Sequence, residues 1–297
     1  MTAEHPQPSD VSAVVCTKNS IASVGPCLQS LRNAGAGEII VVDASSTDGT
    51  RAVADALADR VLEDPGTGLG QARNLGIAAS SRDFILNMGS DNVMPPEQLQ
   101  RMLSTLTRES MAGVSAQTRI AGSGYIAFGL NTWRSGRFRP GPVAVIGTPT
   151  LFRGDLLRAS PFNPDRSFSD DSELCERWKQ DFDATFAISD AYVYEEGKVS
   201  WQELRVRCQM YGQSDQEVFS QGVKNDWPLS RRLKSLAHPL VADVLTPLTT
   251  VTFDRAVRTA PFLIGFAGLR YVYWMKASVL ARRSNERSTP HYGRSAE

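Results

Sequence analysis

Hydrophobic and polar positions in the N-terminal third of the chain follow two alternating periods. Short, mostly apolar runs at residues 11–16 (VSAVVC), 38–43 (EIIVVD) and 83–88 (DFILNM) are typical of strands buried on both faces. Apolar residues at helical spacing follow the first two runs, and a third helical stretch, from about Gly70 to Ala79, precedes the last one. This alternation predicts an α/β fold in which a mostly parallel sheet is flanked by helices.

The pattern is less regular in the middle of the chain. Residues 122–142 are rich in glycine, arginine and aromatic residues without a regular period, which predicts a long mobile loop. The remaining predicted elements are helices over residues 97–108, 170–180 and 200–221, a strand over 147–152, and two short strands within 185–194 (TFAISDAYVY).

The C-terminal segment 256–283 has a helical pattern in which charged residues interrupt the apolar runs. Eleven uncharged residues separate Arg258 from Arg270, and five separate Arg270 from Lys276. A membrane-spanning helix requires roughly 18 apolar residues, so these runs are too short. Aromatic residues beside arginines are typical of a helix that lies in the membrane interface. A helix packed on the protein or on a second subunit has the same pattern, and both interpretations stay open.

The charge distribution adds to this picture, although the formal net charge is zero. Residues 1–230 contain 21 basic and 28 acidic residues, whereas residues 231–297 contain 11 and 4. A basic C-terminal part is typical of attachment to an anionic membrane surface and also of a solvated extension. Its basic residues alternate with long apolar runs rather than with exposed aromatic residues, so nucleic-acid binding is not expected.

The cysteines and the N-terminal residues bear on location. Cys16, Cys27, Cys175 and Cys208 are scattered without a CxxC pair, which argues against a disulfide framework and against a structural zinc site. The first ten residues contain acid and proline instead of a basic segment followed by an apolar one, so no secretory signal is expected. These features favour a cytoplasmic protein.

Polar residues follow the predicted strands at the edge where a ligand would bind. In open parallel sheets ligands bind beyond the carboxyl ends of the strands, and here those ends carry Thr17, Asp43 and Asp91. Asp43 cannot stay buried without a partner, and a nucleobase or ribose hydroxyl suits it. Asp91 is either a turn former or a ligand of a divalent cation that bridges two phosphates. Asp48 is either a ligand contact or the cap of the following helix.

Two further segments contain candidate chemistry. In PGTGLGQARN (65–74) backbone amides can approach phosphate oxygens and Arg73 adds a bidentate cation, although a plain flexible turn has the same composition. The segment does not complete the GxGxxG pattern of dinucleotide-binding dehydrogenases. Asp170 and Asp171 begin a helical stretch, where both can be caps or one can take the proton of an acceptor.

Five blocks in this order, VSAVVCTKN, EIIVVDASSTDGT, GQARNLGIAAS, DFILNMGSDNVMPP and FSDDSELCERW, resemble the family 2 glycosyltransferases of the GT-A fold. The resemblance covers about residues 10–215. We therefore expect a disordered tail (1–9), a GT-A domain (10–222), a C-terminal helical region (223–284) and a second disordered tail (285–297). The resemblance implies nucleotide contacts by Thr17, Asn19, Asp43, Asp48, Arg73 and Ser90, a Mg²⁺ or Mn²⁺ ligand in Asp91, and a catalytic base in Asp171, with Asp170 beside it.

The sequence departs from the family pattern at two positions. The metal motif of the family usually reads Asp-x-Asp, but Gly89 occupies its first position, which puts tight metal binding in doubt. The histidine that usually follows the late strand is Glu195 here, and this carboxylate could take part in metal binding instead. The QxxRW segment of processive synthases is absent, since the comparable residues 205–213 read RVRCQMYGQ. Transfer of a single sugar is therefore expected.

The resulting expectation is an inverting glycosyltransferase that uses a UDP- or GDP-type donor and acts on the hydroxyl of an acceptor glycan or lipid-linked sugar. It would be cytoplasmic or peripheral on the inner face of the cell membrane. The candidate acceptor contacts or loop residues, for which packing is the alternative role, are Trp133, Arg137, Arg207 and Tyr211.

Two other functions are weighed against this expectation. A sugar nucleotidyltransferase should have a GxGxR-type loop directly after the first strand. This sequence reads CTKNSIAS there, which disfavours that function. A GT-A-like nucleotide-binding or scaffold protein with impaired catalysis is favoured by Gly89.

Overall fold

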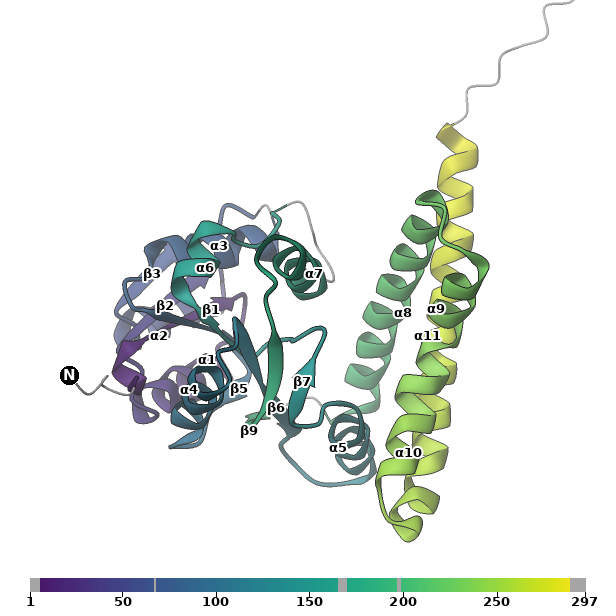
Figure 1. The fold of residues 1–297 in the computed structure, drawn as a ribbon, viewed down its shortest axis with the longest axis horizontal. Coiled ribbons are helices and arrows are strands. Elements are labelled where there is room, and N and C mark those ends of the chain that lie inside the picture. Colours follow the sequence, from purple (N-terminus) through teal and green to yellow (C-terminus); the bar gives the residue numbers. More distant parts are fainter. Residues whose placement is uncertain (1–5, 67, 165–169, 197–198, 289–297) are drawn as a thin grey trace, which may run out of the picture. The chain divides into compact units, whose positions relative to one another are not determined.

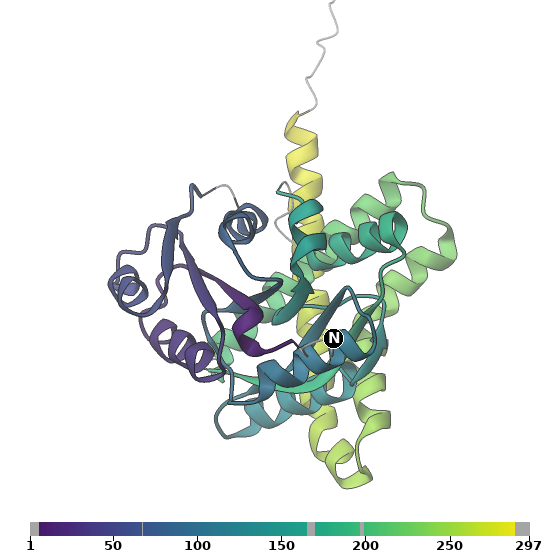
Figure 2. The same ribbon diagram turned by 60° about the vertical axis from the view of Figure 1, so that its left-hand side comes forward.

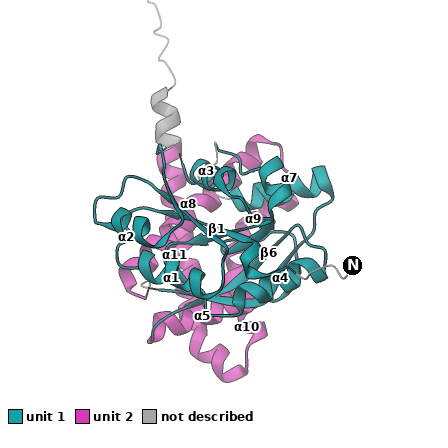
Figure 3. Ribbon diagram, turned by 90° about the vertical axis from the view of Figure 1, so that its left-hand side faces the viewer, with its two compact units in different colours: residues 1–122, 138–198 teal, residues 123–137, 199–297 magenta. Residues whose placement is uncertain are grey.

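A computed structural model describes residues 6–66, 68–164, 170–196 and 199–288, with side chains up to residue 281. The chain forms two compact units, which are coloured separately in Figure 3. The first unit contains residues 1–122 and 138–198, and the second contains residues 123–137 and 199–297. The predicted boundary at residue 222 falls inside helix α8 (Trp201–Lys224), which belongs to the second unit because it packs along α11 (Phe253–Ser288).

The first unit is built on a sheet in the strand order β3-β2-β1-β4-β8-β6-β9-β5, with β7 paired to β9 (Figure 1). Its strands are β1 (Val11–Thr17), β2 (Glu38–Asp43), β3 (Arg60–Glu63), β4 (Phe84–Gly89), β5 (Asn92–Val93), β6 (Gly113–Ile120), β7 (Gly141–Val143), β8 (Thr150–Arg153) and β9 (Phe186–Glu195). Strands β3, β2, β1 and β4 are parallel, whereas β8 is antiparallel to both of its neighbours. The predicted mostly parallel α/β sheet is confirmed.

Helices cover both faces of this sheet (Figure 2). They are α1 (Val24–Asn33), α2 (Thr50–Leu57), α3 (Leu69–Ala79), α4 (Gln98–Arg108), α6 (Gly154–Ala159) and α7 (Asp170–Phe182), after a short 3₁₀ turn, η1 (Pro8–Asp10). One core lies between the sheet and the apolar sides of α1 and α4, and the other lies against α3, α6 and α7. Burial on both faces explains why β1 and β2 read as continuous apolar runs.

The predictions for the late strands need small corrections. The segment 185–194 forms the single strand β9 instead of two, because it pairs with β6 along its length and absorbs a register shift opposite Ser115 and Gln117. The strand expected from residue 147 begins at Thr150.

The prediction of a mobile loop over residues 122–142 is wrong. Residues Tyr125–Arg137 form helix α5, which belongs to the second unit. Its glycines mark close packing: a Cβ on Gly129 would lie 2.3 Å from the ring of Phe262, and one on Gly136 would lie 2.5 Å from the Cα of Pro247. The glycine content that indicated a loop therefore serves contacts between helices, and the apolar helical spacing of Ile126, Leu130 and Trp133 was the better signal.

The second unit is helical throughout its described residues. Besides α5, α8 and α11 it contains α9 (Leu229–Leu240), a π-helical turn η2 (Val241–Leu245) and α10 (Thr246–Thr250). Within the described part of the chain no helix has a long enough apolar stretch to cross a membrane. Of the expected disordered tails, residues 1–5 and 289–297 lie outside the described residues, whereas Pro8 and Ser9 belong to η1 and residues 285–288 belong to α11.

Candidate active site

Side-chain hydrogen bonds hold together the loops that follow β1 and β2. Asp43, at the end of β2, accepts hydrogen bonds from the backbone N–H and the hydroxyl of Ser46 (3.0 and 2.5 Å). The Ser46 hydroxyl accepts from the backbone N–H of Asn19 (2.8 Å), and the Asn19 side chain accepts from the N–H of Thr47 (2.9 Å). Asn19 and Asp43, two of the predicted nucleotide contacts, thus lie in one hydrogen-bonded loop pair at the carboxyl edge of the sheet.

Asp48 and Thr17 lie near this loop pair but have different surroundings. Asp48 accepts hydrogen bonds from the N–H and hydroxyl of Thr50 (3.0 and 2.5 Å) and from the N–H of Ile21 (3.1 Å). These bonds, chiefly the one from the Thr50 hydroxyl, lower the pKa of Asp48. Because Thr50 is the first residue of α2, Asp48 satisfies a backbone N–H at the start of this helix, although the N-cap position itself is Gly49. Thr17 is buried, and its hydroxyl has no partner among the described residues.

The segment after β4 joins the same edge of the sheet. The Ser90 hydroxyl donates to the Ser20 hydroxyl (3.1 Å), which links this segment to the loop after β1. The Asp91 carboxylate folds back over Gly89, so that a Cβ at position 89 would lie only 2.8 Å from its Oδ1. The Asp91 backbone carbonyl accepts from the N–H of Glu196 (3.0 Å). The glycine therefore makes room for the one carboxylate that remains of the expected pair.

Arg73 of α3 connects segments that are far apart in the sequence. Its guanidinium donates to the Asp170 carboxylate and to the Thr148 hydroxyl (2.9 Å), and it lies 3.5 Å from the carboxylate of Asp171. The central carbon of the same guanidinium lies 5.0 Å from the centre of the Phe162 ring. Arg73 is 8% exposed. A buried cation between two carboxylates fixes the position of all three charged groups.

The two carboxylates of this cluster differ in what they can do. Asp170 accepts from Arg73 and from the backbone N–H of Asp171 (3.0 Å), so both of its oxygens have partners. Asp171 has the more exposed side chain, 24% against 11%. The pKa of Asp171 is raised to about 6, mainly by burial and to a smaller extent by Asp170, while Arg73 opposes the shift. A carboxylate whose pKa lies near neutrality is suited to accept a proton and release it again.

A pocket of about 210 Å³ lies at this edge of the sheet. Its lining includes Arg73 on one side and Ser90 and Asp91 on the other, together with three residues that the sequence did not single out, Cys16, Asn87 and Thr148. Three larger hollows, of about 590, 450 and 290 Å³, contain none of the predicted site residues. The sequence does contain a signal for Asn87 as a site residue, because it is an amide within the otherwise apolar strand pattern of β4. It contains no such signal for Thr148.

The thiol of Cys16, which lines this pocket, is poorly suited to act as a nucleophile. Burial raises the pKa of its thiol to about 12. The thiolate, which is the reactive form of cysteine, is therefore not populated near neutral pH. The charged side chains that line the pocket are Arg73 and Asp91.

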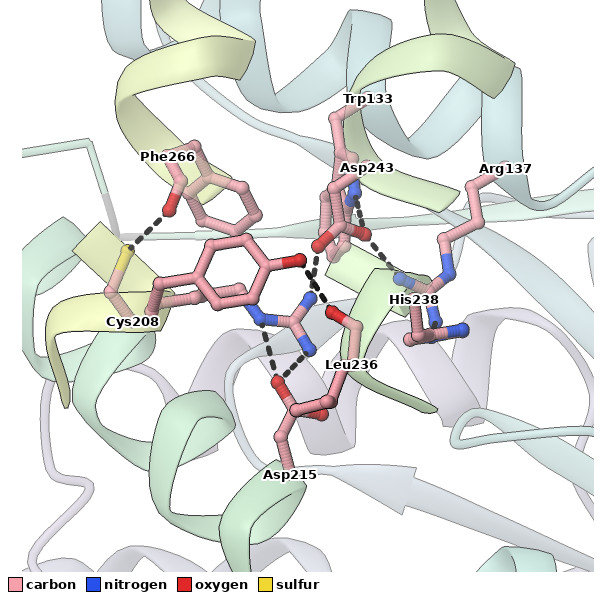
Figure 4. Close-up of polar contacts among 10 residues, drawn as sticks. Trp133, Arg137, Cys208, Asp215, Leu236, His238, Asp243 and Phe266 are labelled. Carbon is pink, nitrogen blue, oxygen red and sulfur yellow. Dashed lines mark hydrogen bonds and ion pairs between the residues drawn. The ribbon is translucent and has the colours of Figure 1, made fainter. Parts of the chain in front are cut away.

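The candidate acceptor residues Trp133, Arg137 and Tyr211 lie in the second unit, where the first two contact the buried acid Asp243 (Figure 4). The Trp133 indole donates to Asp243 (2.8 Å), and Arg137 forms an ion pair with the same carboxylate. The Tyr211 ring lies 6.1 Å from that of Trp133. Trp133 and Arg137 thus lie on helix α5 and not in the loop that the sequence suggested. Arg207, on α8, is half-buried.

Metal ligands are few in the described part of the chain. There, no group of three or more histidine, cysteine, aspartate or glutamate side chains is arranged to hold a metal ion. Glu195 is buried and pairs in register with Asn92, next to Asp91. A cation at this edge would therefore need ligand atoms from a bound molecule in addition to Asp91.

Comparisons with known proteins show which family the chain is similar to. Residues 12–159 match the model of the family described as Glycosyl transferase family 2. The putative glycosyltransferase EpsH of Bacillus subtilis is 34% identical over 107 residues, which are 34% of this chain and 31% of that protein. The succinoglycan biosynthesis protein ExoO of Rhizobium meliloti is 35% identical over 100 residues, 32% of this chain and 29% of that protein. The similarity thus spans about a third of these relatives.

Solved structures with low sequence identity share the fold. The mannosyltransferase PcManGT from Pyrobaculum calidifontis, in complex with GDP-Man and Mn²⁺, has a TM-score of 0.61 at 16% identity, over 92% of this chain and 88% of that one. S. aureus TarS 1-349 in complex with UDP-GlcNAc has a TM-score of 0.51 at 15% identity, over 92% of both chains.

Proposed function

Since this chain belongs to glycosyl transferase family 2 and has the GT-A fold, we propose that it transfers a single sugar, with inversion, from a nucleoside-diphosphate sugar to an acceptor hydroxyl. The observation that carries the proposal is the cluster of Arg73, Asp170 and Asp171 beside the pocket that Asp91 lines. It combines a cation for a departing diphosphate with a carboxylate of raised pKa.

The proposed mechanism is in-line displacement at the anomeric carbon. Asp171 accepts the proton of the acceptor hydroxyl as the new glycosidic bond forms, and the bond from the anomeric carbon to the diphosphate breaks on the opposite side. Arg73 faces the negative charge that develops on the departing diphosphate. Asp170 holds Arg73 in place, which makes it a positioning residue. The loop pair that contains Asn19 and Asp43 binds the nucleoside.

A divalent cation fits this donor set. Mg²⁺ and Mn²⁺ prefer oxygen ligands, and such ions are commonly held by one or two carboxylates together with the phosphates of the substrate. Asp91 would supply the carboxylate, and the diphosphate of the donor would supply the remaining negative charge around the cation. When bound, the cation would neutralise charge on the leaving diphosphate. Because Gly89 removes one acid from the site, we expect the cation to bind together with the donor and weakly without it.

The identity of the substrates is proposed from chemistry and from named relatives. UDP-GlcNAc and GDP-Man in the complexes of TarS and PcManGT make a UDP- or GDP-type donor our choice. The similarity to the succinoglycan biosynthesis protein ExoO supports a role in the biosynthesis of a polysaccharide or other glycan. The acceptor would then be a glycan or a lipid-linked sugar.

Donor hydrolysis without an acceptor tests this function. We expect a screen of UDP- and GDP-sugars with Mn²⁺ to find one donor that the protein hydrolyses slowly, because water can replace the acceptor at Asp171. Calorimetry with UDP and GDP, with and without Mn²⁺, serves as the companion measurement. Nucleotide binding without hydrolysis or transfer of any donor would support the impaired scaffold protein instead, and no nucleotide binding at all would refute both.

We further propose that the exposed face of α11 contacts the inner face of the cell membrane. The apolar residues Val257, Ile264, Val272, Met275 and Val279 recur along one side of this helix and are 39–60% exposed. The described side chains of this helix include one exposed acid, Asp254, and three basic residues that are not buried, Arg255, Arg258 and Lys276. An apolar face next to basic side chains is the pattern of a helix that lies on anionic lipid.

Vesicle binding tests the membrane proposal. The wild type should sediment with vesicles that contain anionic phosphatidylglycerol, and Ile264→Glu should weaken binding by about 10-fold, because a charge replaces an apolar side chain at the contact. Val206→Glu is the matched control, since Val206 is a similarly exposed residue (53% against 60%) on α8. Equal loss in both variants, or a wild type that dimerises and stays off vesicles, would contradict the proposal.

A further inference from the structure

Asn87 and Thr150 are two of the three side chains in the sheet of the first unit that are buried without a hydrogen-bond partner among the described residues, the third being Thr17. Asn87 on β4 is 2% exposed, and neither its amide oxygen nor its amide nitrogen has a partner among the described residues. Thr150 on β8 is 1% exposed, and its hydroxyl likewise has no partner there. Buried polar groups in native proteins are nearly always hydrogen-bonded, so two unsatisfied side chains in one place require an explanation.

The two side chains are neighbours on one face of the sheet. Asn87 and Thr150 are directly paired in the antiparallel register of β4 and β8, so their Cβ atoms lie about 4.5–5.5 Å apart. Ile85 and Phe152, two residues away on the same strands and therefore on the same face, pack in the core against α3, α6 and α7. That is the face from which Arg73 of α3 and Asp171 of α7 reach the carboxyl edge.

Thr150 is not among the residues that line the pocket beside the Arg73, Asp170 and Asp171 cluster, but its neighbour Asn87 is. Asn87 lines the 210 Å³ pocket together with Arg73, Asp91 and Thr148. This volume is below the 300–1,000 Å³ typical of a pocket for a whole small ligand, so it suits one part of a larger molecule. Within the pocket the charged groups are Arg73 and Asp91, whereas Asn87 supplies neutral hydrogen-bonding capacity.

Packing alone does not explain these residue types. Leucine and valine have nearly the same shapes as asparagine and threonine and would fill the same space without leaving donors and acceptors unpaired. An amide and a hydroxyl together offer both a donor and an acceptor. A sugar hydroxyl, which also donates and accepts, complements them, whereas a phosphate would prefer the Arg73 guanidinium.

We propose that Asn87 and Thr150 form a subsite that binds a hydroxyl group of the sugar being transferred, and so contributes to the choice of donor. The inference rests on the proposed function, because it places the sugar of a nucleotide donor in this pocket. A site built to hydrogen-bond a hydroxyl discriminates strongly against a ligand that lacks it, because the buried polar groups are then left unpaired. The subsite would therefore separate sugars by their hydroxyl pattern.

The test compares the free nucleotide with the nucleotide sugar. Calorimetry on the wild type, Thr150→Val and Asn87→Leu would use UDP, GDP, UDP-GlcNAc, UDP-glucose and GDP-mannose with Mn²⁺. In the variants we expect affinity for the free diphosphate to stay within about 2-fold, and the additional affinity that the sugar confers to fall by about 10-fold or more. Ser189→Ala is the control, because this equally buried hydroxyl (1% exposed) donates to the Ser115 carbonyl (3.1 Å) away from the pocket.

Thermal stability without ligand provides a second readout. Removing an unsatisfied hydroxyl should leave the melting temperature of Thr150→Val unchanged or raise it by about 2–4 °C, whereas Ser189→Ala should lower it. A fall in Thr150→Val as large as that of the control, with the sugar's contribution intact, would show that an ordered water satisfies the pair and would overturn the proposal. If Asn87→Leu does not fold, the result for Thr150→Val alone decides whether the subsite binds the sugar.

The two proposals fail in different ways. A wild type that binds nucleotide sugars more tightly than free nucleotides, with the difference unchanged in both variants, overturns the subsite and leaves the proposed function standing. A wild type that binds no UDP, GDP or nucleotide sugar overturns the proposed function, and the subsite with it.

Discussion

Replacing Asp171 by asparagine should abolish sugar transfer while leaving donor binding intact. Asparagine preserves the size of the side chain but cannot take a proton, and loss of a general base lowers rates by about 10²–10⁴-fold. Donor binding should stay within about 2-fold of the wild type, because Arg73 keeps its ion pair with Asp170. The measurements are the transfer rate with the donor found in the screen and calorimetry with the matching nucleoside diphosphate.

The pH profile of the wild type gives an independent check of the same assignment. Asp171 must be ionised to accept a proton, and its pKa is raised to about 6. The rate should therefore be low below pH 6, rise through that region and level off above it. The residual activity of Asp171→Asn should lack this rise, because the titrating group is gone.

A matched aspartate elsewhere on α7 controls for the substitution itself. Asp181 is exposed near the end of the same helix, so Asp181→Asn should transfer sugar at the wild-type rate and keep its pH profile. Transfer by Asp171→Asn at the wild-type rate, or a wild-type profile that is flat between pH 5 and 7 (roughly one unit on either side of the pKa), would contradict the assignment of the base.

Part of the site followed from the sequence for a clear physical reason. Parallel strands have their carboxyl ends at one edge of the sheet, so the predicted strands alone bring Asp43 and Asp91 to the same edge. The approach of Arg73 to Asp170, which are 97 positions apart, has no such local cause. Only the resemblance to a family could suggest it, because the contact depends on how α3 and α7 pack on the sheet.

Other features could not be read from the sequence because the local signal was ambiguous. Glycines in residues 122–142 indicated a loop, yet Gly129 and Gly136 are needed where α5 packs closely against other helices of the second unit. Thr148 contacts Arg73 from a segment without regular structure, so no periodicity marks it. Asn87 was visible as an amide in an apolar strand, but its lack of a partner appears only in three dimensions.

Gly89 shows how a departure from a family pattern acquires a physical meaning. In the sequence it is simply a missing acid. In the structure its lack of a side chain gives the Asp91 carboxylate a place to lie, because a Cβ there would be 2.8 Å from Oδ1. An aspartate at position 89 would therefore have to displace Asp91 before it could add a ligand.

Replacing Asp243 by asparagine should destabilise the second unit more than any surface substitution there. Asp243, on η2, is completely buried and forms ion pairs with Arg137 and Arg270, and it accepts a hydrogen bond from Trp133. Removing one partner of a buried charge network leaves the others uncompensated, which typically costs about 3–5 kcal/mol. The expected result is a fall in melting temperature of roughly 10 °C or more.

Tryptophan fluorescence during urea unfolding measures this effect in the right part of the molecule, because four of the five tryptophans lie in the second unit. Asp254→Asn is the matched control: Asp254 is 84% exposed and lies 3.8 Å from Arg258, so its loss should change stability by less than about 1 kcal/mol. The stability of Asp215→Asn should lie between those of the other two variants, since Arg270 keeps Asp243 as a partner.

If Asp243→Asn unfolds at the same urea concentration as Asp254→Asn, the buried network does not stabilise this unit. A replacement of the whole network by apolar residues would then be the informative variant, because well-packed apolar side chains often match or exceed a buried ion pair in stability.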